Sequence, residues 1–309
     1  MLKALVRRVA PESAYGIGRR IARHMRRRMR RPPLTEAALA SVVRDELGVR
    51  KGDVVLVHSS VDALQLDFSF ARLLPLLRDL VGSEGTLLFP ASHLLERPER
   101  WFERNDVFDV LRTPTSMGIL PELARRQTDA VRSLHPTHSV VAIGSMASEL
   151  VSTHHRDRYP CGRESPFFKI TQCGGKIIGL GVETDVLTSV HCVEDLSPDR
   201  FPVCTHREQV YEGRVRTREG TECVVHTLVA HPRIRWRHMR PFFERYVEPS
   251  DCRLLRCADR SFYRADAAGL LRQMSELSER GITMYRRGIY RGHILEPMLS
   301  ELAERLEER

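Results

Sequence analysis

Residues 53–60 read Asp-Val-Val-Leu-Val-His-Ser-Ser, a short apolar and β-branched run that ends in three polar residues. A run of this length predicts a strand buried on both faces of a sheet. A second run, Lys-Ile-Ile-Gly-Leu at 176–180, has the same character. Ligands of open α/β sheets collect beyond the carboxyl ends of the strands, so His58, Ser59 and Ser60 are candidates for a binding site. A capping serine pair beside a structural histidine is the equally weighted alternative.

Strand-like and helix-like segments alternate along the rest of the chain. Further strands are expected at 85–90, 139–143 and 222–226, and helices at 36–47, 70–81, 119–126, 147–154, 267–280 and 294–308. The charged stretch 92–112 is expected to be an irregular excursion. The alternation predicts an α/β fold with a mixed sheet flanked by helices.

Composition excludes several classes of protein. The chain has 309 residues, of which 42% are hydrophobic and 29% charged, enough to bury a large core without disulfides. Its seven cysteines include no CxxC pair, which argues against a disulfide framework or a thiolate zinc site. The sequence contains no 18-residue apolar run and no pattern of a signal peptide, so we expect a cytoplasmic protein.

The formal net charge of +9 is concentrated at one end of the chain. Residues 1–33 carry eleven Lys and Arg against one acid, so the rest of the chain is close to neutral. Ile17, Ile21, Met25 and Met29 form a narrow apolar stripe in this basic helical arm. Such an arm suits an anionic membrane or an acidic partner, and a solvated extension is the alternative. We therefore expect an arm at 1–33 and one domain at 34–309.

Three motifs carry possible chemistry. Thr115 and Ser116, before the helix at 119–126, suit either an anion pocket or an ordinary N-cap. His135 and His138 are spaced for a metal, but no third ligand with matching spacing lies nearby.

The third motif is His191-Cys-Val-Glu194, in which residues i and i+3 share a helix face. Glu194 can then orient His191, as a general base requires. So short a pattern more often corresponds to a surface ion pair, which is the alternative. Cys192 faces elsewhere and is expected to be a structural cysteine.

Six segments, in this order, resemble the aminoglycoside 3-N-acetyltransferase family. They are KGDVVLVHSS at 51–60, VGSEGTLLFP at 81–90, FDVLRTPTSMGILPE at 108–122, RSLHPTHSVVAIG at 132–144, CGRESPF at 161–167 and GGKIIGLGVETDVLTSVHCVED at 174–195. The likeness spans about residues 35–200, and the C-terminal third is less similar.

The resemblance implies an acyl-CoA-dependent N-acyltransferase with no metal. His191 would be the general base on the acceptor amine, and Glu194 would orient it. The implied acyl-CoA contacts are His58, Ser59, Ser60, Ser116, Met117, Gly118, His135, Ser139 and Val140. The implied acceptor contacts are Asp109, Glu183 and Asp185.

The acceptor would be an amine of an aminoglycoside or amino sugar. Arginines in 92–112 favour, as an alternative, a biosynthetic enzyme for a nucleotide-linked amino sugar or another anionic amine. Two other classes stay open: a nucleic-acid or membrane-binding module acting through the arm, and a metal hydrolase using His135, His138 and His191. A homodimer is a further expectation.

Overall fold

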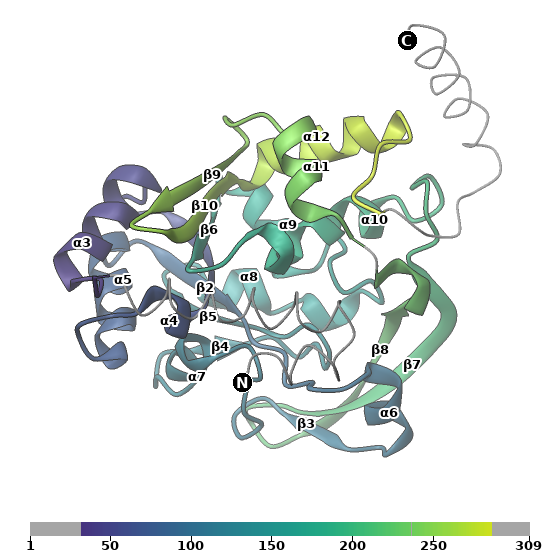
Figure 1. The fold of residues 1–309 in the computed structure, drawn as a ribbon. Helices are drawn as coiled ribbons and strands as arrows, with labels where there is room; N and C mark the ends of the chain where they lie inside the picture. Colours follow the sequence, from purple (N-terminus) through teal and green to yellow (C-terminus); the bar gives the residue numbers. More distant parts are fainter. Residues whose placement is uncertain (1–31, 236, 286–309) are drawn as a thin grey trace, which may run out of the picture.

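The computed structural model describes residues 32–235 and 237–285. Seven strands form the main sheet in the order β4-β5-β2-β1-β6-β10-β9 (Figure 1). In its centre β1 (Val54–Ser59) lies parallel to both β2 (Thr86–Pro90) and β6 (Lys176–Leu180). The outer strands, β5 (Val140–Gly144), β4 (Val131–Arg132), β10 (Arg260–Asp266) and β9 (Cys252–Cys257), run antiparallel to their neighbours. The predicted mixed sheet is thus confirmed.

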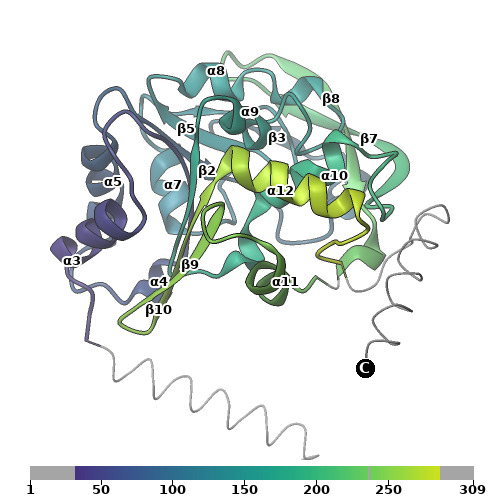
Figure 2. The same ribbon diagram turned by 90° about the horizontal axis from the view of Figure 1, so that it is seen from above.

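Helices cover both faces of this sheet (Figure 2). One face is packed by α3 (Glu36–Ser41), α4 (Val61–Leu64), α5 (Leu73–Val81) and α7 (Ile119–Arg125). The other is packed by α8 (Ala147–Val151), α9 (Pro166–Gln172), α10 (Cys192–Leu196), α11 (Met239–Tyr246) and α12 (Ala267–Glu279). Within β1, Val54 and Leu56 enter one core and Val55 and Val57 the other, because successive strand residues point to opposite faces.

A second sheet lies beside the first and orders the stretch that we expected to be irregular. Its strands are β3 (Val107–Asp109), β7 (His206–Arg216) and β8 (Glu222–Ala230), and α6 (Pro98–Glu103) packs on it. Trp101 and Phe108 are buried against Val215 and Val225 in a small separate core. The expectation for 92–112 was wrong because these two aromatic residues find their apolar partners more than 100 residues further along the chain.

Local signals at the ends of helices were only partly informative. The Thr35 side chain caps α3 by accepting a hydrogen bond from the Ala38 N–H at 3.1 Å. By contrast, Thr115 and Ser116 do not cap α7, whose N-cap residue is Gly118. Their hydroxyls donate instead to the Ser92 carbonyl, at 2.9 and 3.0 Å. The capping prediction was wrong because a loop distant in sequence offers these hydroxyls a carbonyl acceptor.

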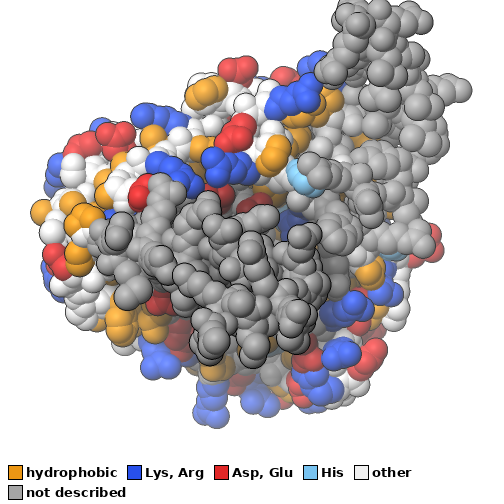
Figure 3. Space-filling view, viewed as in Figure 1, with side chains coloured by type: hydrophobic (Ala, Val, Ile, Leu, Met, Phe, Trp, Pro, Cys, Tyr) orange, Lys and Arg blue, Asp and Glu red, His pale blue; other side chains and the backbone are white. Residues whose placement is uncertain are grey.

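The face of the molecule drawn in Figure 3 carries charged side chains of both signs among its described residues. This agrees with the near-neutral charge counted for the chain outside the arm. The arm at 1–33, apart from its last two residues, and the helix expected at 294–308 lie outside the described residues. Within the described part of the chain, none of the helices is both long and apolar enough to cross a bilayer.

Candidate active site

The path of the chain after β6 brings His191 close to the polar end of β1. Gly181 follows β6 with a positive φ of 72°, and a Cβ atom there would lie 2.8 Å from the Ser60 carbonyl oxygen. The chain then continues through short 3-10 turns at Thr184–Val186 and Thr188–His191 into α10. The Thr188 N–H points at His58 Nε2, at 3.4 Å. The two predicted polar clusters therefore meet at the same edge of the sheet.

His191 and Glu194 form the pair that their spacing predicts. His191 Nδ1 lies 2.6 Å from Glu194 Oε1, and the Glu194 side chain is only 2% exposed. The second carboxylate oxygen accepts a hydrogen bond of 2.6 Å from the Tyr285 hydroxyl. Glu194 is thus held at both oxygens, and it fixes the plane of the imidazole ring.

Hydrogen-bond geometry assigns the proton within this pair. Arg237 Nη1 lies 2.5 Å from His191 Nε2, and a guanidinium can only donate. Nε2 therefore presents its lone pair, the ring proton sits on Nδ1, and Nδ1–H donates to an ionised Glu194. Burial and, to a smaller extent, the nearby charge of Arg237 lower the pKa of His191 to about 3, so the ring is neutral at pH 7.

The charge state of Glu194 reflects two opposing effects. Burial outweighs the lowering effects of the Tyr285 hydroxyl and the charge of Arg237, and the net result raises the pKa of Glu194 to about 8. Burial, together with the Glu194 charge, raises the pKa of Tyr285 well above its ordinary value, so its hydroxyl keeps the proton that it donates. We assign the ionised form to Glu194 because both of its oxygens face donors.

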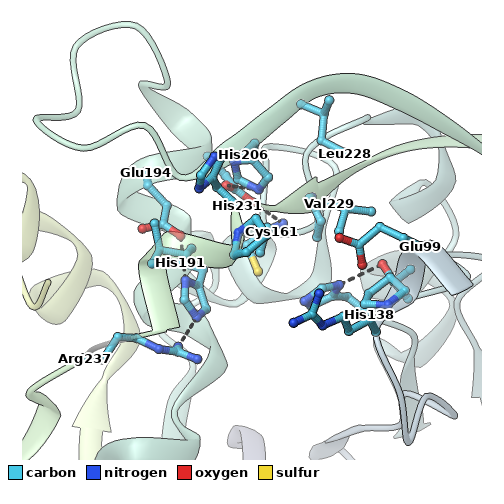
Figure 4. A pocket seen from close by; sticks show the side chains of 18 of the residues that line it. Glu99, His138, Cys161, His191, Glu194, His206, Leu228, Val229, His231 and Arg237 are labelled. Carbon is cyan, nitrogen blue, oxygen red and sulfur yellow. Dashed lines mark hydrogen bonds and ion pairs between the residues drawn. The ribbon is translucent and has the colours of Figure 1, made fainter. Parts of the chain in front are cut away.

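A cavity of about 540 Å³ opens beside His191 (Figure 4). Its polar lining includes His138, His191, His206 and Arg237. Glu99 and His138 lie across the cavity from His191 and Arg237. Burial lowers the pKa of His138 to about 4 and that of His206 to about 3. These histidines are therefore neutral around pH 7 and can accept or donate hydrogen bonds to a ligand.

Asp195, the neighbour of Glu194, supports the wall of the cavity from within the protein. The Cys161 N–H donates to its Oδ2 at 2.7 Å, and His206 Nε2 lies 3.4 Å from its Oδ1. Burial and the adjacent Glu194 raise the pKa of Asp195 well above its ordinary value. Cys192 is buried in the core, as expected of a structural cysteine, and all seven cysteines are free.

The residues expected to contact acyl-CoA fall into two groups. His58, Ser59 and Ser60 lie at the carboxyl end of β1, and Met117 is exposed before α7 beside Ser116 and Gly118. His135, Ser139 and Val140 are fully or almost fully buried. His135 contacts Thr227 and stacks on His154, and Ser139 donates to the Ala91 carbonyl. This second group is buried in the protein, and a direct contact with acyl-CoA stays a prediction for all nine residues.

The residues expected to contact the acceptor do not line the cavity beside His191. Asp109 accepts from the N–H groups of Leu111 and Arg112, at 2.9 Å each, and so closes a turn after β3. Glu183 forms ion pairs of 3.5 Å with Arg240 and Arg256 at a separate pocket. Asp185 is exposed in the turn at Thr184–Val186. Their role toward an acceptor stays a prediction.

Sequence reasoning missed Arg237 and Tyr285. Their backbones pair with each other in an isolated antiparallel bridge, and the His238 N–H donates to the Met284 carbonyl at 3.0 Å. This bridge brings two segments from the less recognisable C-terminal third to the His191–Glu194 pair. No spacing rule in the sequence announces it, because the partners are separated by almost 50 residues. Among the described residues, no group of three or more His, Cys, Asp and Glu side chains is placed to hold a metal ion.

Comparisons with known proteins agree with this fold. This α/β fold is shared by a class of acetyltransferases of known structure. The sequence profile described as aminoglycoside 3-N-acetyltransferase matches residues 56–265. The chain belongs to the aminoglycoside 3-N-acetyltransferase family.

Matches to individual relatives cover about half of this chain. Aminoglycoside N(3)-acetyltransferase VIII of Streptomyces fradiae is 35% identical over 178 residues, which cover 52% of this chain and 61% of that protein. Aminoglycoside N(3)-acetyltransferase III of Serratia marcescens is 32% identical over 190 residues, covering 55% of this chain and 69% of that protein. The matches thus span less than two thirds of the length of several curated relatives, 61% for the first.

Solved structures extend the likeness in fold over more of the chain. The aminoglycoside acetyltransferase AAC(3)-Xa superimposes with a TM-score of 0.68 at 23% identity, covering 84% of this chain and 96% of that one. A structure described as AAC-IIIb binary with CoASH has a TM-score of 0.66 at 25% identity, covering 80% and 97%. The likeness to the first is one of fold alone.

Proposed function

We propose that this protein is an acyl-CoA-dependent N-acyltransferase that acetylates an amine of an aminoglycoside or amino sugar. The observation that carries the proposal is the neutral His191, backed by the buried Glu194 and facing a cavity large enough for a small acceptor. Membership of the family and the CoA-bound neighbour support acyl-CoA as the donor. A neighbour described as AAC-VIa bound to sisomicin supports an amine acceptor.

The chemistry follows from the geometry of the pair. An amine nitrogen placed near His191 Nε2 attacks the thioester carbonyl, and Nε2 accepts the proton that the nitrogen loses as the new C–N bond forms. Glu194 stabilises the resulting imidazolium through Nδ1–H. The C–S bond then breaks, and the CoA thiolate leaves and takes up a proton. Orienting the amine and the thioester together contributes much of the rate, because it replaces an encounter of two free molecules.

The first test follows the free thiol released from acetyl-CoA by purified protein with a panel of aminoglycosides and amino sugars. We expect release with at least one acceptor and a loss of about 10²–10⁴-fold in His191→Ala. His226→Ala is the matched control, because that histidine is 59% exposed on β8 and does not line the cavity. Release that persists unchanged in His191→Ala would exclude His191 as the base, and silence with every acceptor would count against the proposed reaction.

The remaining sequence-based expectations stand as proposals beside this one. Residues 34–309 would form the catalytic domain of a cytoplasmic enzyme, and two such domains would associate as a homodimer. The basic arm at 1–33 would bind an anionic membrane or an acidic partner. Deleting the arm would then abolish binding to anionic vesicles and leave thiol release intact.

A further inference from the structure

Arg237 donates a hydrogen bond to His191 Nε2, the atom that the proposed reaction needs free to accept a proton. Its Nη1 lies 2.5 Å from His191 Nε2, and its side chain is exposed to the cavity. An acceptor amine that delivers its proton to Nε2 must take this position from the guanidinium. Another contact must therefore replace the bond between Arg237 and Nε2 when the acceptor binds.

The carboxylates around the cavity are already engaged by the protein. Glu96 forms an ion pair of 2.6 Å with Arg104, and Glu99 one of 3.0 Å with Arg207. A polycationic acceptor would have to compete with these guanidinium groups for both carboxylates.

The two deeper carboxylates are engaged as well. Glu194 binds His191 and Tyr285, and Asp195 accepts from the Cys161 N–H beside His206. Burial raises the pKa of both carboxyl groups, because an apolar environment disfavours their own ionised forms. Both oxygens of Glu194 are occupied, and Asp195 Oδ1, which has no hydrogen-bond partner among the described residues, is buried 3.4 Å from His206 Nε2.

Two cationic side chains of the cavity, by contrast, have no ion-pair partner in the described part of the chain. Among the residues that the structure describes, Arg97 and Arg237 line the cavity with no carboxylate within ion-pair distance. Of these two, Arg237 contacts the base. The phosphates of an acyl-CoA are not its partner, because the pantetheine arm separates them from the thioester that must react at His191.

We propose that Arg237 is a specificity-determining residue, which binds a carboxylate or phosphate group of the acceptor and thereby leaves His191 Nε2 free for the amine. A guanidinium binds either anion through two parallel N–H···O bonds, a stronger contact than its single bond to a neutral imidazole. The acceptor is then an amino compound whose anionic group lies close to the reacting nitrogen. The inference rests on the proposed function and names its substrate class.

The kinetic test uses acceptors that share one amine. Thiol release from acetyl-CoA is measured with glucosamine, with glucosamine 6-phosphate as the phosphate arm, and with muramic acid as the carboxylate arm. We expect the kcat/KM of at least one anionic acceptor to exceed that of glucosamine by tenfold or more. Arg237→Ala removes this preference and Arg237→Lys keeps part of it. Arg245→Ala, on the exposed side of α11 beside Tyr246, is the matched control and retains the preference in full.

A pH profile separates this role from a merely structural one. The charge of Arg237 contributes to lowering the pKa of His191, so its removal raises that pKa. On acidification, His191 of Arg237→Ala is then protonated at a higher pH and stops acting as a base. The acid limb of kcat/KM for glucosamine therefore moves to higher pH in this variant. An unmoved acid limb counts against the contact between Arg237 and the base.

The outcomes distinguish this inference from the proposed function. Turnover of glucosamine or an aminoglycoside with no preference for the anionic acceptors, or a preference that survives in Arg237→Ala, overturns the inference and leaves the function standing. Silence with every acceptor counts against the function, and calorimetry then tests the inference alone. Binding of glucosamine 6-phosphate or muramic acid that weakens at least tenfold in Arg237→Ala supports it, and equal or undetectable binding to both proteins overturns it.

Discussion

At the scale of single residues, the site depends on what holds Glu194 ionised in a buried position. An isolated buried carboxylate is strongly disfavoured, and here three groups compensate it: His191 Nδ1–H and the Tyr285 hydroxyl through hydrogen bonds, and Arg237 through its charge. The first of these was predictable from the i, i+3 spacing of His191 and Glu194. The other two were not, because Arg237 and Tyr285 reach the pair only through a backbone bridge.

Tyr285→Phe tests the importance of the second donor. The change removes a hydrogen bond to a charged group, which contributes about 1.5–3 kcal/mol, and leaves the ring packing in place. Because Tyr285 does not line the cavity, we expect kcat to fall by about tenfold or more and KM to stay close to wild type. Tyr246→Phe, on α11, is the control. A fully active Tyr285→Phe enzyme would show that Glu194 needs no second donor.

At the scale of elements, the turn after β6 determines where His191 lies. Strand β6 was recognisable from its apolar residues, and the helical relation of His191 to Glu194 held even though His191 ends a 3-10 turn rather than lying within a longer helix. The β1 and β6 ends meet because the strands are parallel neighbours, with Ser59 opposite Leu180. No local pattern announces that pairing, since about 120 residues separate the two strands.

Gly181→Ala should therefore damage stability and activity together. Its backbone has φ +72°, and a Cβ atom would approach the Ser60 carbonyl oxygen to 2.8 Å and Leu64 Cγ to 3.1 Å. Gly174→Ala is a matched control, because that glycine has φ +64° but open space around it. We expect the control to lose about 1–2 kcal/mol, the cost of the left-handed conformation alone.

Gly181→Ala should lose more than this in urea unfolding and should also lower kcat, because the turn leads directly to His191. Equal losses in the two variants, with kcat unchanged, would contradict the idea that the close approach of the Ser60 carbonyl positions the catalytic segment.

At the scale of the whole molecule, the core contains histidines that are buried in their neutral form. Burial lowers the pKa of His58 and of His154 to about 3, and that of His135 well below 6.5. The unfolded chain takes up protons on these groups near pH 6.5, whereas the folded protein does not until the pH is much lower. The folded state is therefore progressively destabilised as the pH falls from about 6.5 toward 3, an effect that the raised pKa of Asp195 partly opposes.

The measurement is the free energy of unfolding in urea at pH values between 7 and 5. We expect it to decrease on acidification, and His154→Gln to reduce the slope by up to about 1.4 kcal/mol per pH unit, the contribution of one titrating group. His226→Gln, at an exposed position, should leave the slope unchanged. A slope that is identical in wild type and His154→Gln would show that the buried histidine does not titrate on unfolding.

The amino-acid sequence by itself determined the class of the fold, the positions of strands β1 and β6 along the chain and the His191–Glu194 pair. Apolar runs, helical spacing and short motifs are local properties that a linear chain displays directly. The tertiary structure alone decided the second sheet, the burial of His135 and Ser139, and the approach of Arg237 and Tyr285 to the base. These features depend on contacts between segments far apart in the chain, whose partners are selected by packing and by the need to satisfy buried polar groups rather than by any local pattern.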